Sequence, residues 1–177
     1  SDRLTYQLPE SYQHLTLSCW VQVPANPRDG LHALVMAGGG SPGDLHWQLS
    51  PEIAERWTGR LGCFDEIADD GHYIFQDMDT VLPNMPPAGR WVHLTTTVDV
   101  AAGVCRTYVN GQLSGSQPLT RSDQVCLGEV QVGNWNPISG SGDFERFLDG
   151  AISDLAIFDV TLSDQEVKEL YETTVRP

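Results

Sequence analysis

The stretch "GNWNP" at 133–137 combines the residue types that bind sugars. It follows a strand-like run and is closed by proline, so we expect Trp135 to lie in a loop. Asn134 and Asn136 flank the indole with amide donors and acceptors. An aromatic ring beside planar amides matches the faces and hydroxyls of a sugar. The alternative is that Trp135 plugs one end of the core, because tryptophan is highly buried on average.

Other aromatic residues are weaker candidates for the same chemistry. Trp57 in "ERWTG" and Tyr73 after "DDGH" lie near turn residues and form a second rank. Trp20 and Trp91 fall inside strand patterns, which favours a structural role. Exposed rings beside polar groups would indicate a glycan surface, whereas a larger apolar patch would indicate a protein surface.

Acidic and amide side chains next to glycines suggest a second kind of site. Calcium takes six to eight oxygen ligands, mostly from carboxylates and carbonyls. The sequence therefore predicts a calcium site on a loop rim, with Asx-turns as the alternative reading of each residue. The candidate ligands are Asp44, Asp69, Asp70, Asn134 and Asp143.

Catalytic motifs do not stand out. The five histidines include no HExxH pair, and His46 and His93 fall mid-strand, which favours exposed or hydrogen-bonded strand histidines. The acidic run at 63–71 lacks the ladder that would hold two carboxylates across a glycosidic bond, so we read it as a solvated or cation-holding loop. The glycine-rich stretch 37–44 lacks the lysine of a phosphate-binding loop. A glycoside hydrolase is therefore the less favoured hypothesis, and no catalytic residue is predicted.

Charge and cysteine content limit the kinds of partner and metal site that the chain can have. Acidic residues outnumber basic ones 24 to 10, giving a formal net charge of -14, which disfavours nucleic acid and anionic lipid surfaces. No run of residues is long and apolar enough for a membrane span, so we expect no direct membrane insertion of this segment. The four cysteines lack zinc-site spacing. Cys105 and Cys126 could pair in an oxidising compartment, but free thiols are the favoured prediction.

Short runs with period-two alternation predict an antiparallel β-sandwich. Residues 15–23 alternate Leu15, Leu17, Cys19 and Val21 on one face. Asn110-Gly111 between two strand-like runs predicts a tight hairpin turn. The segment 163–172 predicts one short helix, since Ser163 and Glu166 form a capping box. We expect this helix to pack across one end or edge of the sandwich.

The order and spacing of several stretches resemble the laminin G-like, concanavalin A-like jelly-roll modules. These stretches are "LTLSCWVQV", "GRWVHLTTTVD", "TYVNGQ", "VQVGN" and the strand-plus-helix segment 150–171. The similarity covers nearly the whole chain and implies an all-β jelly roll as a single domain over 1–177. It also implies a non-catalytic binding module for carbohydrate or a cell-surface ligand, in some members with calcium. Ser153-Asp154 stands where the family often has Asp-Glu, so a role for that first acid does not transfer.

A narrower similarity points to the cellular setting. "LTLSCWVQV" and "GDLHWQLS" are similar to C-terminal modules of bacterial FecR-type sigma-regulator proteins. That similarity implies an extracytoplasmic location and an alternative role, as a protein-interaction or structural module of an envelope signalling protein. The ligand, the oligomeric state and the full-length architecture are not specified by these patterns.

Overall fold

The structure is a computed structural model that describes residues 4–22, 32–38, 43–51, 57–67, 73–77, 80–82, 87–119, 124–135 and 146–174. Within these ranges it omits the side chains of residues 50–51, 57–67, 73–77, 80–81, 135 and 146. The elements are β1 (Leu4–Gln7), β2 (Ser11–Tyr12), β3 (His14–Gln22), β4 (His32–Ala37), β5 (Leu45–Pro51), β6 (Trp57–Ile67), β7 (Tyr73–Asp77), β8 (Thr80–Leu82), β9 (Trp91–Asp99), β10 (Val104–Val109), β11 (Gln112–Pro118), β12 (Val125–Cys126), β13 (Glu129–Val132), β14 (Asn134–Trp135), β15 (Arg146–Phe147), β16 (Ile152–Phe158) and α1 (Asp164–Thr174).

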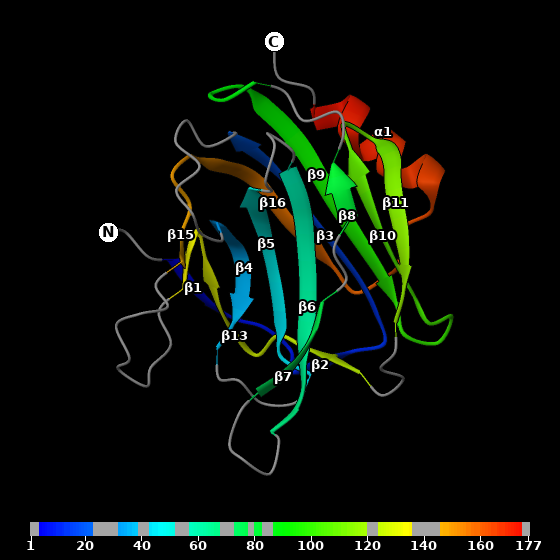
Figure 1. Ribbon diagram of the computed structural model, residues 1–177. Helices are drawn as coiled ribbons and strands as arrows, with labels where there is room; N and C mark the ends of the chain where they lie inside the picture. Colours follow the sequence, from blue (N-terminus) through cyan, green and yellow to red (C-terminus); the bar gives the residue numbers. More distant parts are fainter. Residues whose placement is uncertain are drawn as a thin grey trace.

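Two large antiparallel sheets face each other (Figure 1). The seven-stranded sheet runs β1-β13-β4-β5-β6-β7, with β8 also paired to β6, and the five-stranded sheet runs β11-β10-β9-β3-β16. Two short ribbons, β12-β2 and β14-β15, lie outside these sheets. The predicted all-β jelly-roll sandwich with one short helix is confirmed.

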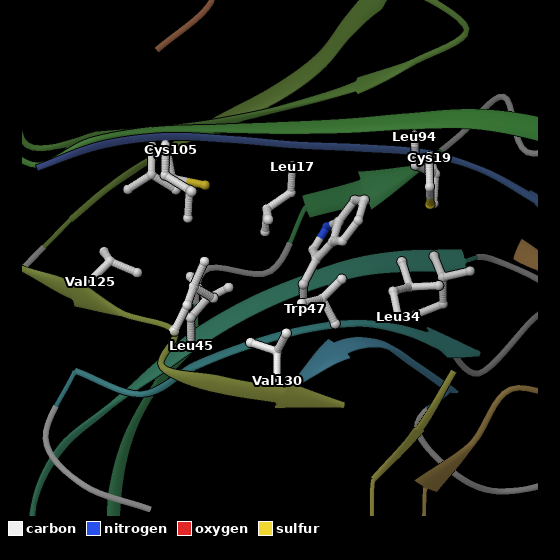
Figure 2. Close-up of a cluster of buried hydrophobic side chains, with 14 of the residues drawn as sticks. Leu17, Cys19, Leu34, Leu45, Trp47, Leu94, Cys105, Val125 and Val130 are labelled. Atoms are coloured by element: carbon white, nitrogen blue, oxygen red, sulfur yellow. The ribbon is translucent and has the colours of Figure 1, made fainter. Parts of the chain in front are cut away.

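The period-two alternation in the sequence produces the core between the sheets. Leu15, Leu17 and Cys19 of β3 are fully buried. Figure 2 shows Leu17, Cys19 and Leu94 pointing from one sheet toward Trp47 and Leu45 of the other. Burying such side chains removes apolar surface from water, which is the main stabilising term of the fold.

The hairpin between β10 and β11 has the predicted turn. Asn110 has φ 49° and Gly111 has φ 73°, so both central residues are left-handed, as a type I′ turn requires. Asparagine and glycine tolerate this region better than other residues. The turn places Gly111 against the ring of Tyr171 in the helix.

The helix begins where its capping box predicts, and it docks beside an edge strand and over the outer face of the five-stranded sheet. The Ser163 backbone N–H donates to Glu166 Oε2 at 2.8 Å, and the Glu166 N–H lies 3.4 Å from Ser163 Oγ. The expectation that α1 covers an end or edge of the sandwich is met in part, because α1 packs beside the edge strand β11. The helix also lies on the outer face of the five-stranded sheet, where the Tyr108 hydroxyl donates to Asp164 at 2.7 Å and the Tyr171 ring lies 5.8 Å from that of Trp20. Trp20 lies on this outer face and is only 6% exposed, because the helix packs over it.

Three further predictions concern the cysteines, two histidines and the acidic run at 63–71. Among the described residues, Cys19, Cys105 and Cys126 are not joined to one another by a disulfide, and the Cys63 side chain lies outside the described residues. His46 and His93 are 1% and 2% exposed, so the exposed alternative is wrong for both, while Ser18 gives His93 a hydrogen-bond partner. Asp65 and Glu66 belong to strand β6 and not to a loop, because β6 continues to Ile67 before the chain turns back.

Candidate functional site

The candidate site is a rim where β14, β15 and the start of β4 meet. Gly133, with φ 71°, ends β13 and turns the chain into β14. Its N–H donates to the Leu34 carbonyl at 3.1 Å, and its own carbonyl accepts from the Leu148 N–H at 2.9 Å. These two bonds fix β14 against β4 and against the chain that follows β15. We call the residues Asn134, Trp135, Phe147 and His32 the rim cluster.

The two central sequence candidates lie in strand β14. Asn134 pairs with Phe147 and Trp135 pairs with Arg146, so the expected loop position of Trp135 is wrong. The pairing arises because Gly133 restarts the chain in extended form beside β15. Asn134 is 4% exposed, so it supports the rim from inside, and Phe147 is 42% exposed. The Trp135 side chain, like all of Asn136, lies outside the described residues.

His32 joins the rim cluster although its spacing in the sequence gave no specific signal. Its Nδ1–H donates to the Phe147 carbonyl at 3.1 Å, so it ties the first residue of β4 to β15. Burial lowers the pKa of His32, opposed by the Phe147 carbonyl and the nearby Asp149 carboxylate. A neutral imidazole that donates to a backbone carbonyl positions the rim. The only available hint was that His32 opens a buried apolar run.

The second-rank aromatic candidates lie in other strands of the seven-stranded sheet. Trp57 is the first residue of β6 and pairs with Pro51 and Leu82, and Leu82 belongs to the core. Tyr73 is the first residue of β7 and pairs with Ile67. The strand register places Trp57 toward the same end of the sheet as His32, two strands from it, and Tyr73 toward the opposite end.

The candidate calcium ligands that the structure describes are also apart. Asp44 is 9% exposed and bridges to Cys126, next to the end of β4 at Ala37. Asn134 lies near the other end of β4, so about five residues or roughly 16 Å of strand separate the two. Among the described residues no group of three His, Cys, Asp or Glu side chains could hold a metal ion. Asp69, Asp70 and Asp143 lie outside the described residues.

With the fold and rim defined, the sequence comparison identifies the family. Residues 6–168 match the laminin G type 3 family, described as the concanavalin A-like lectin/glucanases superfamily. The chain belongs to this superfamily. The match covers both large sheets of this laminin G-like chain and reaches into α1. No curated protein matches its sequence significantly.

Solved structures similar to the laminin G-like chain have low sequence identity to it. A native heptameric SAP-like pentraxin from Limulus polyphemus has a TM-score of 0.75 and 18% identity, covering 99% of this chain and 78% of its own. A Botulinum neurotoxin serotype D ligand binding domain in complex with N-acetylneuraminic acid has a TM-score of 0.64 and 16% identity, covering 98% and 40%. A Botulinum neurotoxin DC binding domain in complex with rat synaptotagmin II has a TM-score of 0.61 and 14% identity, covering 92% and 36%. Likeness at this identity shows a shared fold.

The search for membrane spans gives one further finding. Within the described part of the laminin G-like chain, no helix has the length and apolar character to cross a bilayer.

Proposed function

We propose that this laminin G-like chain is a non-catalytic module that binds carbohydrate. The observation that carries the proposal is the family match over residues 6–168. A neurotoxin binding domain of similar fold in complex with N-acetylneuraminic acid supports the ligand class, and one in complex with synaptotagmin II supports surface binding more broadly.

The proposed binding surface is the rim cluster with its neighbour Asn136. Strand pairing with β15 and the His32 hydrogen bond hold the β14 backbone in one conformation before any ligand arrives. A pre-formed backbone lowers the entropic cost of binding. Phe147, at 42% exposure, adds an apolar ring to the rim. Trp57 and Tyr73 remain separate, secondary candidates.

Replacing Trp135 by alanine tests this surface. We expect Trp135→Ala to abolish retention of the glycans that the rim holds on a glycan array, while the melting temperature stays near that of the wild type. Affinity should be modest, with a Kd between roughly micromolar and millimolar. Leu113→Ala is the matched control, because Leu113 is 49% exposed on β11 in the other sheet.

Two results would count against the proposal. A Trp135→Ala protein that unfolds would place Trp135 in the core and withdraw the rim as the binding surface. Release of reducing ends from glycans by the wild type would replace the binding role with hydrolysis.

A protein-interaction role in an extracytoplasmic envelope protein is the second candidate. Leu4 and Tyr6 are 57% and 51% exposed on β1, an edge strand of the seven-stranded sheet. Edge strands and exposed apolar residues are common docking surfaces for proteins. Binding lost in Tyr6→Ser but retained in Trp135→Ala would favour this candidate and the FecR-type setting.

Calcium is proposed only at candidate residues beyond the described part of the chain. The described candidates Asp44 and Asn134 do not fit a shared site, which leaves Asp69, Asp70 and Asp143. We expect calcium to raise the melting temperature and Asp69→Asn or Asp70→Asn to remove that increase, with Asp149→Asn as the control. Identical melting curves with millimolar calcium and with chelator would rule out a calcium site of functional affinity.

A further inference from the structure

A small, open pocket lies at the end of the sandwich opposite the rim cluster. Its volume is about 250 Å³, and its lining comes from the β2 region and from the chain just after β16. The lining residues are Pro9, Ser11, Tyr12, Gln13, His14 and Asp159. We call this the β2 pocket.

Strand β3 separates the β2 pocket from the rim. His14 begins β3 and Gln22 ends it, a distance of roughly 25 Å along nine residues. The Gln22 N–H donates to the Ala151 carbonyl, just after the chain leaves the rim. The two surfaces therefore cannot share one small ligand. Binding at the β2 pocket is independent of the function proposed for the rim.

The backbone around the β2 pocket is fixed by hydrogen bonds. Tyr12 pairs with Val125 and Ser11 pairs with Cys126 in the β12-β2 ribbon. The Pro9 carbonyl accepts from the Gly128 N–H, and the Gln13 carbonyl accepts from the Val100 N–H at 2.9 Å. A lining held on both sides in this way is pre-organised for a ligand.

Most side chains of the lining accept hydrogen bonds or can both donate and accept them. Asp159 is exposed and offers a carboxylate, and its charge adds to burial in raising the pKa of the Tyr12 phenol. Ser11 and Gln13 add a hydroxyl and an amide. His14 Nδ1 lies 3.3 Å from Thr161 Oγ1 and 3.6 Å from Asp99 Oδ1, so its ring is oriented at the wall.

Charge and size restrict the ligand. None of the lining residues is Lys or Arg, and both nearby carboxylates, Asp159 and Asp99, repel anions. The volume is below the roughly 300–1,000 Å³ of pockets for drug-sized ligands. Pro9 and the Tyr12 ring provide the apolar part of the wall. A neutral ring of hexose size, with several hydroxyl donors, satisfies these limits.

We propose that the β2 pocket binds one neutral hexose unit, with Asp159 accepting hydrogen bonds from its hydroxyls. Ser11, Gln13 and His14 exchange hydrogen bonds with the remaining hydroxyls, and the ring edge rests against Pro9 and Tyr12. Sialic acids and other anionic sugars are rejected by the Asp159 carboxylate. The pocket is thus selective for neutral sugars, independently of what the rim binds.

Titration of the isotope-labelled chain with sugars, followed by NMR, tests the proposal. The probes are the methyl glycosides of glucose, galactose and mannose, with N-acetylneuraminic acid and ethanolamine as the anionic and cationic comparisons. We expect at least one hexoside to shift the amides of 11–14 and 159. Asp159→Asn should weaken its binding about tenfold, because hydrogen bonds to charged acceptors are stronger than neutral ones.

Control variants separate this pocket from the rim. Glu172→Gln, an exposed charge change on α1, and Trp135→Ala should both leave the hexoside affinity unchanged. The proposal is overturned if no hexoside shifts these amides or if Asp159→Asn binds as tightly as the wild type. It is equally overturned if N-acetylneuraminic acid or ethanolamine binds the pocket as well as the hexosides, or if a folded Trp135→Ala loses these shifts.

Discussion

His93 is a neutral histidine buried beneath the helix. Its ring lies 5.3 Å from that of Trp20 and 5.7 Å from that of Tyr171, and its Nε2 lies 3.0 Å from Ser18 Oγ. Burial lowers the pKa of His93 to about 4, although the Asp154 carboxylate opposes the shift. The unfolded chain binds a proton at this residue near pH 6.5, well before the folded chain does.

This difference predicts acid sensitivity. Above about pH 6.5 both states are neutral and the full stability is present; as the pH falls toward 4, the unfolded state gains a proton first. We expect the free energy of unfolding to fall by roughly 2–3 kcal/mol across that window on account of His93. Urea unfolding at about pH 7 and about pH 4.5 measures it. The decrease should shrink in His93→Gln and persist in His14→Gln, and equal pH dependence in all three proteins would contradict the assignment.

Sequence patterns gave the type of chemistry at the candidate rim but not the burial of its residues. "GNWNP" singled out a segment that the structure places in the β14-β15 ribbon, while the closing proline wrongly suggested a loop for Trp135. The strand forms because β15, distant in the sequence, supplies a pairing partner. Asn134 and His32 are buried for the same reason, since the burial of a polar residue depends on segments that its own neighbours do not reveal.

At the scale of elements, the β10–β11 hairpin packs closely against α1. Gly111 has φ 73°, and a Cβ added there would lie 3.0 Å from Tyr171 Cβ. Alanine would therefore suffer both backbone strain and a collision with the helix. Tyr171 also contacts the rings of Trp20 and His93, so moving it would disturb the cover of the outer face.

Replacing Gly111 by alanine measures how tightly the helix docks. Gly89→Ala is a matched control, because Gly89 has φ 78° and an added Cβ would meet nothing within 4 Å. We expect Gly89→Ala to cost about 1 kcal/mol from strain alone and Gly111→Ala to cost about 1–3 kcal/mol more. Urea midpoints of the two variants give the comparison. Equal destabilisation would mean that Tyr171 moves away at no cost.

The capping box illustrates which part of an element the sequence determines. Ser163 and Glu166 are close in the chain, so their reciprocal bonding depends little on the rest of the molecule and was predicted correctly. The sequence predicted an end or edge for docking, which β11 supplies, but it did not predict the cover over the outer face. This cover depends on Trp20, His93 and Tyr108, which reach the outer face from three strands spread over much of the chain.

For the whole molecule, the all-β sandwich followed from alternation, turn residues and the absence of long helical patterns. Leu15, Leu17 and Cys19 face the core as their spacing predicted. The strand order was not predictable in this way. β1 pairs with β13 and β3 pairs with β16, so both sheets join the two ends of the chain. Alternation assigns faces to a strand but carries no information about its neighbours.

One hydrogen bond crosses the core and joins the two sheets. Trp47 of β5 is 2% exposed, and its Nε1–H donates to Thr96 Oγ1 of β9 at 3.0 Å. Figure 2 shows the indole between the two layers. An indole N–H without a partner in this core would keep its full desolvation cost.

A double-mutant cycle tests whether this bond couples the sheets. Thr96→Val should destabilise the fold by about 1–3 kcal/mol, because it leaves the Trp47 Nε1–H unpaired. Trp47→Phe removes that N–H but also leaves unfilled volume. The double variant should therefore cost less than the sum of the two, with a coupling of about 0.5–3 kcal/mol. The control cycle pairs Trp47→Phe with Thr95→Val, because Thr95 lies on the opposite face of β9 and bonds to Ser18. Costs that add equally in both cycles would show that the Trp47–Thr96 bond does not couple the two sheets.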